Sequence, residues 1–228
     1  MLKLAIADNC TLKFCREIKE HWERKGHEVR YEIGASEYLA QWADLYYVDW
    51  WDGNLDYLWK LYNGVEGVSR TPDWDNNRKP KIVVRAIDWD VWCAFVPTSQ
   101  QYVDFVDKVI CITPHIEKLM RSQADFGDKL HLIRPGVVVD NFSFRADRTG
   151  YNIAMVTGDI WMMKNVMEGL TIFNSLVKRY PEYPWKLHWR GQYADHARYM
   201  QAAVEYFMES RELKERVVLY PSNSNMNE

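Results

Sequence analysis

A glycine, a lysine and an asparagine lie where a predicted strand meets a predicted helix, within residues 153–165. A glycine lets a ligand approach the backbone closely, and the free N–H groups of a helix N-terminus attract phosphate. Lys164 adds a full positive charge, so Gly158, Lys164 and Asn165 together could hold a diphosphate. The run is neither a Walker A loop nor G-x-G-x-x-G. The alternative is an ordinary strand-to-helix turn with a solvated lysine.

A second cation stands at the end of the next predicted strand, residues 185–189. Arg190 and Gly191 follow that strand directly. Because the carboxyl ends of parallel strands meet at one edge of a sheet, Arg190 could reach the same phosphate.

Acidic and aromatic side chains end two predicted strands in the first half of the chain. Asp88, Trp89 and Asp90 follow KIVVRAI (81–87), and Asp49 and Trp50 end the strand before it. These carboxylates could bind a ligand's hydroxyl groups, and the rings could stack on the apolar face of a sugar. Helix capping and core packing are the alternatives. The histidines show no partners for a Ser-His-Asp triad.

Strand and helix patterns alternate along nearly the whole chain. Because βαβ units form parallel sheets with helices on both faces, we predict an α/β fold. The expected strands are 2–7, 27–33, 44–48, 81–87, 107–112, 130–134, 152–156, 185–189 and 216–220, and the expected helices include 11–25, 55–62, 164–180 and 194–213.

The polar run 145–150 interrupts this alternation and predicts a linker. The expected domains are therefore 1–144 and 151–228. The second has only three strands, and its last strand has no helix after it. We expect the natural protein to be longer, with this second domain incomplete.

The composition excludes several classes of protein. A net charge of −3 gives no basic surface for nucleic acid, and the apolar runs are too short to span a bilayer. Peripheral membrane contact and the oligomeric state stay open. The four cysteines show neither zinc-site spacing nor a disulfide framework, so we expect no metal and a cytoplasmic location.

Five short motifs in order resemble the retaining glycosyltransferases of family 4, which have the GT-B fold of two Rossmann-like domains. They accompany the loop at 158–165 and are Gly26-His27-Glu28-Val29, the strand-to-helix step 109–116, the run 133–142 with Arg134-Pro135-Gly136, the run Leu187-His188-Trp189-Arg190-Gly191, and the strand 217–220. The likeness covers essentially the whole chain.

The resemblance implies sugar transfer from a nucleoside diphosphate sugar to an acceptor hydroxyl, with retention of configuration. The donor diphosphate would bind Gly158, Lys164, Asn165, Arg190 and Gly191 in the second domain. The first domain would bind the acceptor through Asp49, Trp50 and Trp89, with Asp88 and Asp90 as catalytic candidates. The donor is a substrate, so we expect no cofactor.

Departures from the family pattern leave other functions open. Asp159 stands where the family usually has arginine, Pro221 replaces a glycine, and a glutamate-rich donor motif would lie beyond Glu228. We therefore expect poor turnover by this chain. The alternatives are a non-catalytic nucleotide-sugar-binding remnant and a sugar-nucleotide epimerase of the same fold.

Overall fold

The computed structural model describes residues 1–9, 15–68, 70–71, 74–75, 78–87, 91, 97–136, 150–160, 164–193 and 198–220. The chain divides into two compact units, Met1–Val137 and Val138–Glu228. Of the predicted linker 145–150, only Gly150 lies within the described residues.

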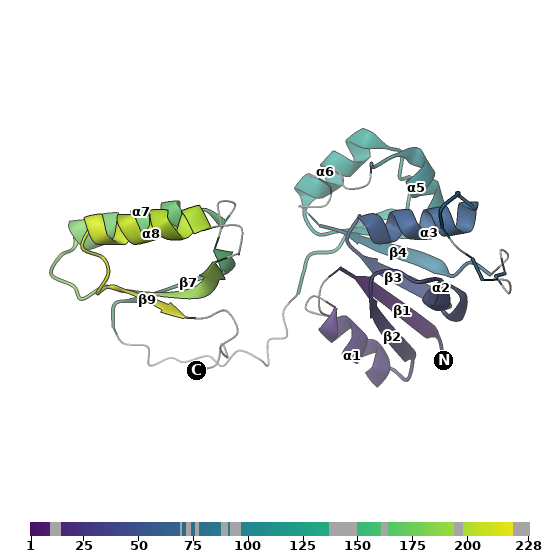
Figure 1. The fold of residues 1–228 in the computed structure, drawn as a ribbon, viewed down its shortest axis with the longest axis horizontal. Coiled ribbons are helices and arrows are strands. Elements are labelled where there is room, and N and C mark those ends of the chain that lie inside the picture. Colours follow the sequence, from purple (N-terminus) through teal and green to yellow (C-terminus); the bar gives the residue numbers. More distant parts are fainter. Residues whose placement is uncertain are drawn as a thin grey trace. The chain divides into compact units, whose positions relative to one another are not determined.

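The first unit is a six-stranded parallel sheet with helices between its strands (Figure 1). Its elements are β1 (Lys3–Asp8), α1 (Arg16–Arg24), β2 (Glu28–Ile33), α2 (Glu37–Trp42), β3 (Leu45–Asp49), α3 (Gly53–Asn63), β4 (Lys81–Ala86), α5 (Gln100–Phe105), β5 (Lys108–Cys111), α6 (Pro114–Gln123) and β6 (Leu130–Leu132). The strand order is β2-β1-β3-β4-β5-β6, so the chain reverses its direction of winding between β1 and β3.

Helices cover both faces of this sheet, as the alternation predicts. One face packs on α2, α3, α5 and α6 through a large buried cluster that includes Leu39, Leu58, Val103 and Met120. The other face carries a smaller cluster with Ile6 and Tyr47, against which Ile18 of α1 packs. The parallel α/β fold predicted from the sequence is confirmed.

Several helix boundaries follow from local sequence signals. The Ser36 side chain accepts a hydrogen bond from the Leu39 amide at 3.2 Å, which confirms Ser36 as the N-cap of α2. Gly26 follows α1 with φ of 83°, a left-handed conformation that glycine adopts without strain. The α6 helix begins at Pro114, where the missing N–H costs no helical hydrogen bond.

The polar stretch between α3 and β4 is tied to the helices beside it. The Arg70 guanidinium donates to the Leu61 carbonyl near the end of α3 at 2.7 Å, and Arg78 donates to the Trp42 carbonyl of α2 at 3.3 Å. Both Thr71 donors reach Glu37 at 2.6 Å. These arginines therefore cap helix ends, where cations favour the last carbonyls.

In its described residues, the second unit contains a three-stranded parallel sheet with α7 and α8 on one face (Figure 1). Its elements are β7 (Asn152–Ile160), α7 (Val166–Arg179), β8 (Lys186–Tyr193), α8 (Arg198–Ser210) and β9 (Val217–Tyr220). A Cβ atom on Gly169 of α7 would come within 2.7 Å of the Met155 sulfur on β7, so the helix lies very close to the strand. None of the helices in the described ranges has the length and apolarity that crossing a bilayer requires.

We expect Asp107→Asn to destabilise the first sheet in a pH-dependent way. Asp107 accepts from the Ile82 amide at 2.9 Å and the Lys81 ammonium at 2.7 Å. Burial works to raise the pKa of Asp107, but these hydrogen bonds leave the pKa below its usual range. The charged form is therefore favoured on folding, and the stabilisation disappears as pH falls through this depressed pKa.

Urea unfolding should show a loss of about 1–2 kcal/mol for Asp107→Asn near neutral pH. The difference from the parent should shrink below about pH 4, near the ordinary pKa of aspartate. Asp128→Asn, which removes the exposed partner of Lys108, is the control and should change stability less. A loss that is the same at every pH would contradict this account.

Candidate functional site

Gly158 lies inside a strand, which corrects the predicted turn. The β7 strand continues past Val156 to Ile160, and β8 continues past Trp189 to Tyr193. After a register shift between Val156 and Gly158, Gly158 pairs with Gly191. Glycine is unfavourable in a strand interior and suggests a turn in a single sequence. Here the two strands pair beyond the end of β9.

Lys164 and Asn165 immediately precede α7, as the sequence predicts. Lys164 is exposed, and Asn165 takes the N-cap position with φ of 50° and makes no side-chain cap hydrogen bond. The first amides of α7 therefore receive no side-chain acceptor from their cap residue, and the helix dipole adds partial positive charge there. The negative charge of Glu168, in the first turn of α7, opposes the binding of an anion there.

Arg190 belongs to the face of the second sheet opposite the helices. Its neighbour Trp189 is 1% exposed and packs in the cluster formed with α7 and α8. Side chains alternate along a strand, so Arg190 lies on the same face as His188. The His188 ring bridges the Tyr220 hydroxyl and the Asn152 amide oxygen, each at 3.0 Å. Arg190 thus lies on the face of the sheet away from α7, the helix that Lys164 precedes.

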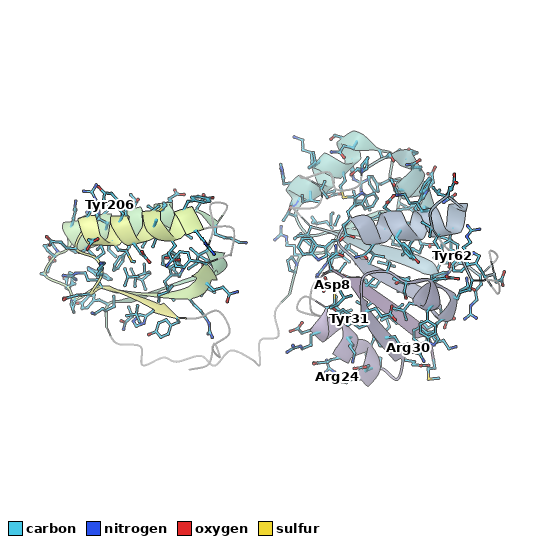
Figure 2. The ribbon with its side chains drawn as sticks, in the orientation of Figure 1. Asp8, Arg24, Arg30, Tyr31, Tyr62 and Tyr206 are labelled. Carbon is cyan, nitrogen blue, oxygen red and sulfur yellow. The ribbon has the colours of Figure 1, made fainter. Side chains whose placement is uncertain are left out.

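In the first unit, acidic groups gather where the strand order reverses. Asp8 ends β1 and is labelled in Figure 2, and Asp49 ends the adjacent β3. Both residues are 0% exposed. The carboxyl ends of strands at such a reversal form the usual ligand crevice of open α/β sheets.

Arg85 of β4 is the main partner of the buried Asp49. Its Nε donates to Oδ1 at 2.5 Å and its terminal nitrogen donates to Oδ2 at 2.7 Å. Burial raises the pKa of Asp49, and the two hydrogen bonds from Arg85 oppose that rise. The sequence predicts that Asp49 contacts an acceptor. The structure instead commits both of its oxygens to a bidentate ion pair.

Cys15 completes this cluster. Its sulfur and one oxygen each of Asp8 and Asp49 lie within 4.8 Å of one another, a grouping compatible with a metal ion. Burial raises the pKa of the Cys15 thiol well above its usual range, which disfavours the thiolate that metals bind. Arg85 already supplies positive charge to Asp49. The donors present therefore fit a buried ion-pair network better than a metal site.

An amide–carboxylate network extends from this point toward the surface. The exposed Asn9 donates to Asp52 and accepts from the Asn54 side chain at 3.0 Å. Asp52 also accepts from the Asn54 amide at 2.8 Å, and Asn54 accepts from the Ala35 amide at 2.8 Å. These contacts hold Asn9 in a defined position at the carboxyl end of β1.

Trp50 follows β3 with φ of 92°, a conformation that bulky residues rarely adopt. Its amide donates to the Arg85 carbonyl at 2.9 Å, which holds the strained backbone in place. Such strain clusters at functional sites. Trp50 thus lies at the predicted edge, whereas Asp88, Trp89 and Asp90 lie outside the described residues.

The sequence alone predicts no role for Asn9, Asn54 or Arg85. The available signal was the position of Asp8 and Asn9 after the first strand. The pairing of Arg85 with Asp49 spans 36 residues, and no local pattern indicates it.

We expect Arg85→Met to destabilise the first unit strongly, because it leaves the Asp49 carboxylate buried without its cation. Breaking a buried ion pair on one side costs about 3–5 kcal/mol, measurable by urea unfolding. The double variant Asp49→Asn/Arg85→Met should recover much of this loss. Lys81→Met, which removes an ammonium whose side chain is 76% exposed, is the matched control. A cost for Arg85→Met no larger than the control's would contradict the pairing.

No family model matches this sequence, and no curated protein matches it. Solved structures do match. A glycosyltransferase from Rickettsia africae ESF-5 has a TM-score of 0.64 at 9% identity, covering 99% of this chain and 69% of its own. HepE from Anabaena, bound to UDP and glucose, has a TM-score of 0.62 at 9% identity over 99% of this chain and 70% of its own. TarM from S. aureus has a TM-score of 0.55 at 12% identity over 79% of this chain.

The similar structures also include an epimerase. UDP-N-acetylglucosamine 2-epimerase from Rickettsia bellii has a TM-score of 0.53 at 12% identity, over 98% of this chain and 70% of its own. The chain spans about a third of the length of TarM, 33%. At these identities the likeness shows the fold. The chain has a GT-B-like fold class with two parallel-sheet units, the second with three strands among its described residues.

Proposed function

We propose that this chain is a glycosyltransferase that moves a sugar from a nucleoside diphosphate sugar to an acceptor hydroxyl. One observation carries the proposal. Lys164 and Asn165 open α7 next to the carboxyl end of β7, where Gly158 lies opposite Gly191. The GT-B-like fold supports it, since HepE shares this fold and binds UDP and glucose.

In this proposal, the second unit holds the donor diphosphate. The first amides of α7 and the Lys164 ammonium bind its oxygens, and Arg190 approaches from the other face of the sheet. The Gly158–Gly191 pair lets the ligand come close to the backbone. Fixed positive charge stabilises the anion that develops on the leaving diphosphate, which is the main electrostatic task of sugar transfer.

We also propose retention of configuration without a metal ion, on the family resemblance. Lys164 and Arg190 then supply the positive charge at the leaving group. A cytoplasmic location remains a prediction from cysteine usage.

The proposed acceptor contacts come from the carboxyl edge of the first sheet. Asn9 and Trp50 present a polar group and an aromatic ring there, and Trp89 stays a predicted contact. Asp49 is assigned to holding Arg85, because its oxygens are already occupied. Asp88 and Asp90 follow β4 and remain the predicted catalytic candidates.

Epimerisation of a sugar nucleotide is the second candidate, favoured by the similarity to the Rickettsia bellii epimerase. The reaction products separate the two functions. A transferase forms a new glycosidic bond and releases a nucleoside diphosphate, whereas an epimerase changes the sugar and keeps it attached. A binding remnant gives neither product.

We expect Lys164→Ala to weaken UDP binding by at least about tenfold, because it removes a full charge from the diphosphate site. Isothermal titration with UDP measures this. Lys164→Arg should retain most of the affinity. Lys178→Ala is the matched control, since Lys178 is an exposed lysine in the last turn of the same helix. Equal losses in Lys164→Ala and Lys178→Ala would contradict the proposed site.

Incubation with UDP-glucose and a saccharide acceptor tests the reaction type. We expect slow release of UDP together with a glycosylated product detected by mass spectrometry. Release should fall in Lys164→Ala because the departing diphosphate loses its stabilising charge. A changed sugar still bound to UDP would instead identify an epimerase.

A further inference from the structure

A cavity of about 620 Å³ lies at the amino ends of β8 and β9, on the opposite edge of the second sheet from Gly158 and Lys164. Its walls come from the start of β8, the end of α8 and the segment that leads into β9. This volume is within the roughly 300–1,000 Å³ typical of small-molecule sites. The donor site described above uses none of its residues.

Pro184, Trp185 and Met208 form the apolar part of the lining. The Trp185 ring also makes contacts with residues outside the lining. Its indole nitrogen donates to the Tyr180 carbonyl at 3.2 Å. Tyr151 and Tyr183 meet it edge-on at centroid distances of 5.0 and 6.0 Å. The ring is therefore fixed in orientation before any ligand binds, which lowers the entropy cost of binding.

The charged part of the lining is balanced. Three basic side chains face three acidic ones: Lys186, Lys214, Arg216, Glu209, Glu212 and Glu215. The charges cancel in sum, so the lining carries no excess positive charge that would favour a phosphate or another strong anion. Its carboxylates accept hydrogen bonds and its cations donate them. The best ligand is thus neutral, with donors and acceptors close together.

Two of these cations already have partners that fix the rim. The Lys186 ammonium donates to the Glu215 carbonyl, and the Lys214 ammonium lies 3.1 Å from the Glu209 carboxylate. Glu212, with φ of 57° in the turn after α8, is exposed and has no carboxylate contact to another side chain among the hydrogen bonds and ion pairs described. It offers an acceptor to a ligand hydroxyl.

We propose that this cavity binds a neutral oligosaccharide, with one pyranose stacked on Trp185. A pyranose has an apolar face that suits an indole and a rim of hydroxyls that both donate and accept hydrogen bonds. The proposal goes beyond the transfer reaction and does not depend on it. In a glycosyltransferase, such a site would hold a saccharide chain away from the donor edge.

Indole N–H cross-peaks of the ¹⁵N-labelled full chain test this directly. The Trp185 cross-peak is assigned by its loss in Trp185→Phe. Titration with maltotetraose, cellotetraose and chitotetraose should shift it saturably for at least one of the three. No shift with any tetrasaccharide up to ~10 mM, the concentration range of weak recognition, would overturn the proposal.

Variants locate the binding by isothermal titration with the tetrasaccharide that shifts Trp185. Trp185→Ala should lose at least about tenfold in affinity and Trp185→Phe less, since it keeps an aromatic platform. Glu212→Gln leaves the ring untouched and should lose about threefold, the size of one weakened hydrogen bond. Glu20→Gln on α1 is the control. If Glu212→Gln and Trp185→Ala both bind this tetrasaccharide with unchanged affinity, the proposed site is wrong.

A parallel UDP titration separates this site from the donor site. UDP should bind Glu212→Gln and Trp185→Phe as it binds the parent. If UDP fails to bind while the tetrasaccharide still shifts Trp185, the proposed transfer function fails and the saccharide site stands. UDP competing with the tetrasaccharide for the Trp185 cross-peak would contradict two separate sites.

Discussion

Parallel strand pairing is the constraint on which the rest of this structure depends. It directs every carboxyl end of a sheet to the same edge, so residues far apart in the sequence meet there. In the second unit this edge joins Gly158, Gly191 and the start of α7. In the first unit it joins the ends of β1, β3 and β4. The two sites differ because different side chains end the strands.

Charged side chains are buried at the carboxyl edge of the first sheet. Two carboxylates are withdrawn from water, and the partly buried Arg85 supplies two hydrogen bonds to Asp49. Burying charges in this way lowers the stability of the folded protein unless every partner is present. Its effect is to hold the ends of β3 and β4 in register beside the strained Trp50. The exposed Asn9 is fixed by a second network, in which its side-chain nitrogen donates to Asp52 and its oxygen accepts from Asn54.

The periodic features of the fold could be predicted from the sequence, and the long-range pairings could not. Alternating strand and helix patterns predicted the parallel sheets, and Ser36, Gly26 and Pro114 marked helix ends correctly. Gly158 was placed in a turn because its partner Gly191 is remote in the sequence. Arg85 was missed for the same reason. The cavity beside Trp185 arises from three separate segments, so no single run of residues indicates it.

The central claim is that a diphosphate binds at the start of α7. Backbone amide cross-peaks of the ¹⁵N-labelled chain, followed during a titration with UDP, test it most directly. The account predicts saturable shifts concentrated at Lys164, Asn165 and Val166, with smaller ones at Gly158 and Gly191. Shifts confined to the first unit, or the absence of any saturable shift, would contradict it.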